Sequence, residues 1–541
     1  MKSVFMTSVI EQPQARQAGT PVVQRAGILQ NSFWWGVEIG LNVICTSLLS
    51  IAVARAIGPE GLGHFVYLVF LTNIANKFAD LGTATAARKY MAEHLARGQM
   101  GLARSVFFTT LKLQTVFAII VLVVGVLLAA MFGDPTFRLV GCILVAAIAP
   151  AILTSVPSQA NMAVANYSRN VPGAIAGLVA YTLQTILTLV LGWGLVGLAF
   201  AVFLRRSIEL VWRLVPAMRW MSSLPKEPTS PALYRKLFTF SGHALAISAV
   251  VLIVNDRSEF VFLKHFCDIK QVAFYSVAFG LSEYLASAFL MFTGPIAAEF
   301  MADYAQGEDR AGSKAAKAMR FVSMIVLPVQ FGLAAVSPAL VRLAYGRAYL
   351  PAIPAVVVVA VLAVPKAFFG IMASIYKAAD RQLIMLRYLV LAAVVNLALD
   401  ATLIPRFGTI GAAFGNGLSQ TFAVVAMWGV AARLAHLRMH WQSIARIAIA
   451  AVGMASVVAL VCSSLRPVVA IFVGPLLGFL SYVALLRVLR PLTQHDTETL
   501  INVGQRVPAP VRVITSVLFS RAAVRRMTES DWKIKTLDAE G

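Results

Sequence analysis

Residues 54–65 read Ala-Arg-Ala-Ile-Gly-Pro-Glu-Gly-Leu-Gly-His-Phe and join two long apolar runs, 33–54 and 61–82. A helix needs about 20 apolar residues to cross the hydrocarbon core of a bilayer, and each run has about that length. The two runs are therefore predicted to cross a membrane in succession, with the short segment between them at the membrane surface.

Apolar runs of this length continue to about residue 488. The chain has 541 residues, of which 59% are hydrophobic and 13% charged, and its mean hydropathy is +0.78. Soluble domains carry about 25% charged residues. We predict an all-α polytopic membrane protein of about 14 transmembrane helices. After the first pair, their approximate limits are 106–131, 138–160, 171–192, 194–215, 238–262, 272–297, 319–340, 353–375, 382–403, 410–431, 444–463 and 468–487.

The distribution of basic residues predicts the topology. About twice as many Lys and Arg residues lie on the even-numbered connections as on the odd ones, which places both termini in the cytoplasm by the positive-inside rule. The same rule accounts for the net charge of +22, so we do not expect nucleic acid as a partner. No cleavable signal peptide is evident, and the four cysteines show no metal-binding spacing.

Two sequence matches indicate an internal duplication. Residues 194–201 resemble residues 408–415, and residues 55–65 can be aligned with residues 264–274, at similar offsets. We therefore predict two related six-helix lobes followed by two extra helices. The predicted divisions are a cytoplasmic segment 1–30, an N-terminal lobe 31–220, a linker 221–237, a C-terminal lobe 238–434, transmembrane helices 13 and 14 at 435–488, and a basic cytoplasmic tail 489–541. The tail fits either an amphipathic helix on the anionic leaflet or a solvated segment.

Several cations lie inside the predicted spans. A cation at the bilayer centre costs about 3 kcal/mol on insertion scales, so such residues usually face the interior, pair, or bind an anion. The candidates for a cationic substrate-binding cavity are Arg205, Arg206, Arg257, Lys366, Lys77 and Lys112. For Lys77 and Lys112 the alternative is an anchor at the membrane interface. Glu209, one turn after Arg205, is the natural partner of the arginine pair.

Carboxylates inside the spans are candidates for ion coupling or for pairing with these cations. They are Glu38, Asp80, Asp256, Glu259 and Glu283. Asp256 and Glu259 share a helix face with Arg257 between them, so an ion pair that only locks helices together is an alternative there. The sequence predicts no catalytic residues, no metal site and no cofactor, and leaves coupling to H⁺ or Na⁺ open.

Three motifs resemble those of the polysaccharide-transporter (Wzx-type lipid-linked oligosaccharide flippase) family. They are residues 54–65 with Asp80-Leu81-Gly82 and 87–93, residues 255–257 with 274–278, and Asp400 with 403–408 and 411–413. Ala273 stands where the family usually has glycine. The resemblance covers about residues 30–490 and places the chain in the MOP superfamily, with MATE antiporters and lipid II flippases.

The resemblance implies a flippase that moves an undecaprenyl-pyrophosphate-linked oligosaccharide across a bacterial inner membrane by alternating access. Such a protein is a transporter, not an enzyme, and works beside polysaccharide polymerases and glycosyltransferases. The alternatives are a MATE-like cation-coupled drug antiporter, which would want an acidic cavity, and a membrane polysaccharide polymerase, which would want a larger external loop than this chain has.

Overall fold

The computed structural model describes residues 28–131, 134–164, 166–228, 231–255, 258–290 and 308–490, and within these ranges every regular element is a helix. The longer helices are α1 (Ile28–Asp80), α2 (Thr83–Ala96), α3 (Met100–Ala130), α4 (Pro135–Ala146), α5 (Ile148–Ala163), α6 (Val171–Leu191), α7 (Gly194–Ser222), α8 (Pro231–Asn255), α9 (Glu259–Phe266), α10 (Ile269–Leu290), α12 (Glu308–Ala344), α13 (Ile353–Leu362), α14 (Lys366–Ala378), α15 (Gln382–Leu434), α16 (Trp441–Ser463) and α17 (Pro467–Leu489). The predicted cytoplasmic tail and nearly all of the predicted N-terminal segment lie outside the described residues.

The fourteen predicted spans are confirmed. Two helices contain two spans each, because α1 turns at Gly58 (φ 68°) and α15 turns at Gly408 (φ 54°), and left-handed backbone favours glycine. Three further spans are broken within the bundle, at the junctions α4–α5, α8–α9 and α13–α14. The short 3₁₀ helices Tyr167–Asn170 and Arg347–Ala352 lead into α6 and α13.

The structure differs from the prediction in the connection after the second span. Residues 83–105 were expected to link two spans, but they form α2 and the first turns of α3. In α2, Ala86, Ala87 and Met91 are fully buried and form a core cluster with Phe107 of α3 and Val156 of α5. Small alanine side chains contribute little to the hydropathy of this segment, so the sequence does not indicate that this face of α2 is buried.

The corners matched by the duplication have the same geometry. Gly194 (φ 56°) and Gly408 (φ 54°) both adopt left-handed backbone. Three residues later, Gly197 and Gly411 each lie against the preceding span: a Cβ at Gly197 would lie 2.5 Å from Thr188, and one at Gly411 would collide with the carbonyl of Leu403. Each half therefore uses one glycine to turn the chain and a second to bring the two helices together.

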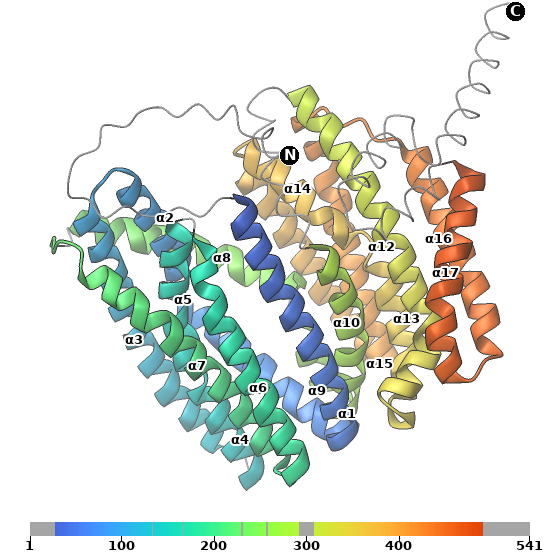
Figure 1. The fold of residues 1–541 in the computed structure, drawn as a ribbon, viewed down its shortest axis with the longest axis horizontal. Coiled ribbons are helices and arrows are strands. Elements are labelled where there is room, and N and C mark those ends of the chain that lie inside the picture. Colours follow the sequence, from blue (N-terminus) through green and yellow to red (C-terminus); the bar gives the residue numbers. More distant parts are fainter. Residues whose placement is uncertain are drawn as a thin grey trace, which may run out of the picture.

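Helix α1 lies between two groups of helices (Figure 1). It packs against α6 and the 3₁₀ helix Tyr167–Asn170 on one side and most extensively against α10 on the other, while α12 packs on α16 and α17. Both groups meet at the end of the bundle where α1 turns, which we call the corner end. There Tyr349 Oη donates to the Ala54 carbonyl at 2.9 Å, Lys270 lies 3.7 Å from Glu60, and Gly63 abuts the Ile269 carbonyl.

Replacing Gly411 with alanine is expected to destabilise the protein by about 1–3 kcal/mol, because the added methyl group has no room beside Leu403. The measurement is the melting temperature of the detergent-purified protein. Gly429→Ala in the same helix is the matched control, since a Cβ there meets no heavy atom within 4 Å. Equal melting temperatures of the two variants would contradict the close approach.

Candidate functional site

A cavity of about 470 Å³ lies between the two groups of helices. This volume is within the range of pockets that hold a drug-sized ligand, about 300–1,000 Å³. Both spans of α1 contribute to the wall, together with α6, α9, α10 and Tyr345, which directly follows α12. The lining residues are Thr46, Ser50, Val53, Leu62, Phe65, Val66, Val69, Phe70, Asn73, Ile74, Asn76, Lys77, Tyr181, Phe260, Ser276, Val277, Gly280, Glu283, Tyr284 and Tyr345.

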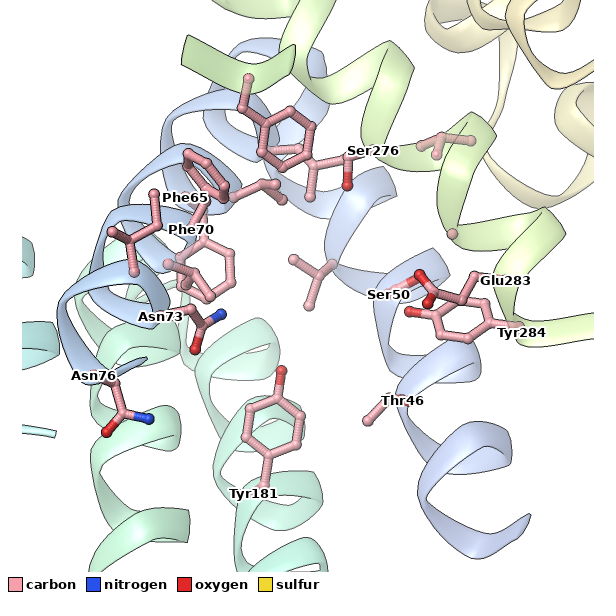
Figure 2. A pocket seen from close by; sticks show the side chains of 18 of the residues that line it. Thr46, Ser50, Phe65, Phe70, Asn73, Asn76, Tyr181, Ser276, Glu283 and Tyr284 are labelled. Carbon is pink, nitrogen blue, oxygen red and sulfur yellow. The ribbon is translucent and has the colours of Figure 1, made fainter. Parts of the chain in front are cut away.

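The lining of the cavity changes from apolar to polar along the second span of α1. Leucine, valine and phenylalanine line the wall from residue 62 to residue 70, and Asn73, Asn76 and Lys77 follow away from the corner. Figure 2 shows Asn73 and Tyr181 facing the space from one side and Ser50 with Tyr284 from the other. The cavity thus joins an aromatic region to a region of amide and hydroxyl groups.

Arg205 and Arg206 share one carboxylate. Arg205 Nε lies 2.9 Å from Glu209 Oε1 and Arg206 Nη1 lies 3.5 Å from Glu209 Oε2, so the pairing expected from the spacing is present. Because α7 begins at Gly194, Arg205 sits about 16 Å along the helix, well within the depth of a span. The glutamate is only 5% exposed.

The network continues to α1 and reaches the cavity wall from behind. Arg205 Nη2 donates to Asn42 Oδ1 at 3.1 Å, and Arg213 Nη2 lies 3.7 Å from Glu38 Oε1. The Arg205 guanidinium lies 5.7 Å from the ring centroid of Tyr181, which lines the cavity. Arg205 is therefore one layer behind the wall, with Tyr181 between it and the cavity.

The other predicted cations occupy different places. Lys77 lines the cavity. Lys366 begins α14 beside Pro365, with its Nζ 5.1 Å from the ring centroid of Phe279, next to the lining residue Gly280. Lys112 is an exposed side chain on α3 and is not among the lining residues. Arg257 and Asp256 lie outside the described residues, so their predicted roles stay predictions.

Asp80 belongs to a polar cluster near the end of α1. Its Oδ1 accepts hydrogen bonds from Gln114 Nε2 at 2.7 Å and from Ser155 Oγ at 3.3 Å. Gln114 Nε2 also lies 3.0 Å from Thr83 Oγ1. The cluster joins α1, α2, α3 and α5, which gives Asp80 a role in holding the N-terminal helices together. Of the predicted carboxylates that the structure describes, Glu283 is the one that lines the cavity.

Glu259 lies in a second buried cluster, which was not predicted from the sequence. Glu259 Oε1 accepts from Asn416 Nδ2 at 2.7 Å, and Asn396 Nδ2 donates to Asp400 Oδ2 at 3.0 Å. Both carboxylate residues are fully buried, and Glu259 Oε2 and Asp400 Oδ1 have no hydrogen-bond partner among the described residues. Ser419 and Gln420 complete the cluster through Asn396 and Asn416.

This cluster has the composition of a site for a small cation. Its amides donate to the carboxylates, which leaves the carboxylate oxygens Glu259 Oε2 and Asp400 Oδ1 as the candidate ligands. Carboxylate oxygens are ligands that hard cations prefer, and a carboxylate pair can also share a proton. Gly415 leaves the room that Asp400 needs, since a Cβ there would lie 2.5 Å from Asp400 Oδ1. Phe260, the neighbour of Glu259, lines the main cavity, so the cluster lies directly behind the cavity wall.

The family profile described as "Polysaccharide biosynthesis protein" matches residues 52–354, more than half of the chain. The chain belongs to this family. A second profile, "Lipid II flippase MurJ", matches residues 291–478 of the chain. The family resemblance expected from the three motifs is thereby confirmed. No curated protein matches the chain.

Solved structures of flippases and transporters share the fold. Lipid II flippase MurJ in an inward closed conformation has a TM-score of 0.67 at 10% identity, covering 85% of this chain and 98% of that one. An inward-facing multidrug resistance MATE family transporter of the MOP superfamily has a TM-score of 0.61 at 15% identity, covering 73% and 95%. A MOP superfamily transporter from Pyrococcus furiosus has a TM-score of 0.51 at 14% identity, covering 77% and 99%.

Glu209→Gln removes the carboxylate that Arg205 and Arg206 share. Cations left without a partner at this depth are expected to lower the free energy of unfolding by about 3–5 kcal/mol, seen as a lower melting temperature in detergent. Glu93→Gln is the matched control, because Glu93 pairs with Arg97 at 2.9 Å on the surface, where a pair contributes about 0–1 kcal/mol. Equal losses of melting temperature in the two variants would contradict a structural role for the network.

Proposed function

We propose that this protein is a flippase for a lipid-linked oligosaccharide, with undecaprenyl pyrophosphate as the carrier. The observation that supports the proposal best is the cavity between the two groups of helices, which combines aromatic rings with amides and hydroxyls. Sugars offer hydroxyl groups to such amides and apolar C–H faces to such rings. Membership of the polysaccharide biosynthesis family agrees with a glycan cargo.

The cargo divides between three environments in this proposal. The polyprenyl tail stays in the bilayer, the sugars enter the cavity, and the pyrophosphate lies near Lys77, at the end of the cavity away from the corner. Arg205 and Arg206 carry one more positive charge than Glu209 neutralises, and they lie behind Tyr181 on the same side. Arginine suits bidentate contact with phosphate oxygens, and lysine suits contact as a point charge.

The proposed mechanism is alternating access. Contacts at the corner end, among them Tyr349 with Ala54 and Lys270 with Glu60, would hold the predicted outer side closed in this conformation. Outward movement of an anionic head group is favoured by an inside-negative potential, at about 2.3 kcal/mol per charge and 100 mV. The protein acts in this proposal in a bacterial inner membrane with both termini cytoplasmic, alongside the glycosyltransferases and polymerase of one pathway.

We further propose that the cluster of Glu259 and Asp400 binds the coupling cation, H⁺ or Na⁺. Two carboxylates in a membrane interior favour a bound cation, because the negative charge of one raises the free-energy cost of ionising the other and a cation offsets that cost. The unpartnered oxygens Glu259 Oε2 and Asp400 Oδ1 are available for it. Because Glu259 is adjacent to the lining residue Phe260, cation binding to Glu259 can shift the position of Phe260 in the cavity wall. Such a shift would couple cargo movement to an ion gradient.

The MATE-like alternative fits the cavity less well. A cavity for a cationic drug gains from an excess of carboxylates, whereas this lining holds one lysine and one glutamate. The Glu259 and Asp400 cluster lies behind the wall and is absent from the lining.

Deletion of the gene from its parent bacterium is expected to cause accumulation of a lipid-linked glycan that stays inaccessible to reagents added outside the inner membrane. The measurement is mass spectrometry of extracted lipids after labelling intact spheroplasts with periodate and a hydrazide. Complementation with the wild-type gene should restore outer-leaflet labelling. A deletion strain with unchanged outer-leaflet labelling would refute the flippase function.

Glu259→Gln and Asp400→Asn are expected to abolish the effect of the coupling cation on thermal stability. A ligand that binds only the folded state raises stability by about 2.7 kcal/mol at 100 times its dissociation constant. The measurement is the melting temperature of purified protein in NaCl against KCl and across pH. A sodium-specific shift identifies Na⁺, and a shift with pH alone identifies H⁺. Variants that respond to both as the wild type does would contradict the site.

A further inference from the structure

The cavity is close to electrically neutral. Among its lining residues, Lys77 and Glu283 are the charged ones, of opposite sign. Arg205, the cation nearest behind the wall, is held by Glu209 and Asn42. The proposed function assigns Lys77 to the pyrophosphate, so an acidic sugar elsewhere in the cavity would lose its hydration without gaining a cationic partner among the described lining residues. The lining therefore favours a sugar without ionised groups.

Asn76 supplies a hydrogen-bonding group that the protein itself does not use. Its Oδ1 is buried and accepts no hydrogen bond from any described residue, although it lines the cavity. As placed, this oxygen is shielded from the open space, and a ligand meets it only after the amide rotates toward the cavity. A buried amide oxygen without a partner costs about 1–3 kcal/mol, which a donor on the ligand then recovers. The same reasoning holds if the amide is turned by 180°, because its nitrogen then needs an acceptor.

Asn73 lies three residues before Asn76, on the same face of α1, and also lines the cavity. Figure 2 shows Tyr181 and Tyr284 facing the same space from α6 and α10. Phe65 and Phe70 of α1 lie toward the corner end of the same wall. A pyranose ring can place its apolar face on a phenylalanine while its hydroxyl or acetamido groups reach the two asparagines.

We propose that Asn73 and Asn76 of α1 form hydrogen bonds with the hydroxyl or acetamido groups of a neutral pyranose in the cavity. This inference deepens the proposed function and rests on it. The two amides then determine which sugars are accepted. The substrate class is a lipid-linked glycan whose sugars nearest the pyrophosphate are uncharged.

The test uses the deletion strain complemented with the full chain and follows outer-leaflet labelling of its native lipid-linked glycan. Asn73→Ala and Asn76→Ala are each expected to lower the labelling rate about 5- to 10-fold, and the double variant more. Raising the supply of the lipid-linked precursor should restore part of the rate, as expected for weaker binding. Thr72→Ala is the matched control on α1, because Thr72 Oγ1 donates to the Leu68 carbonyl of its own helix at 2.6 Å.

Two results would overturn the inference while leaving the flippase function intact. One is an export rate of the double variant equal to that of Thr72→Ala, at equal amounts of protein in the membrane. The other is a mass spectrum of the accumulated glycan with uronic acids or other ionised sugars next to the pyrophosphate. Absence of accumulation in the deletion strain would instead reject the flippase function itself, which separates the two failures.

Discussion

Every charge that this chain places at membrane depth has to be compensated by the protein, because lipid offers it no partner. On α7 this requirement shapes the packing of three helices. A Cβ at Gly177 of α6 would lie 2.6 Å from the Glu209 side chain, and one at Gly173 would lie 3.1 Å from that of Arg213. Glycine on α6 thus admits the charged groups of α7, and Glu38 and Asn42 of α1 complete their coordination.

The position of the cavity follows from that packing. Tyr181 of α6 is held between the Arg205 guanidinium and the open space, and α1 is held at Asn42, one turn before the lining residue Thr46. The charges that seemed from the sequence to face the cargo therefore also fix its wall. In the proposed function, their excess of positive charge acts on the cargo from a second layer, while uncharged groups make up most of the lining.

The sequence predicted what depends on local spacing. The number of spans, the similar segments that begin at Gly194 and Gly408, and the pairing of Arg205 with Glu209 all follow from residues close together in the chain. The cluster of Glu259 with Asp400 did not follow, because its members come from α9 and from both spans of α15. Nor could the lining be predicted, since a span that is apolar on all sides does not reveal which face turns inward.

The two predicted halves differ in the charge of their buried networks. Arg205 and Arg206 correspond by the repeat to Ser419 and Gln420, and these four residues belong to networks of opposite character. One half holds guanidinium groups around Glu209, and the other holds carboxylates around Asn396 and Asn416. The network of the first predicted half thus carries a net positive charge and that of the second contains two carboxylates, so the two halves are not electrically equivalent.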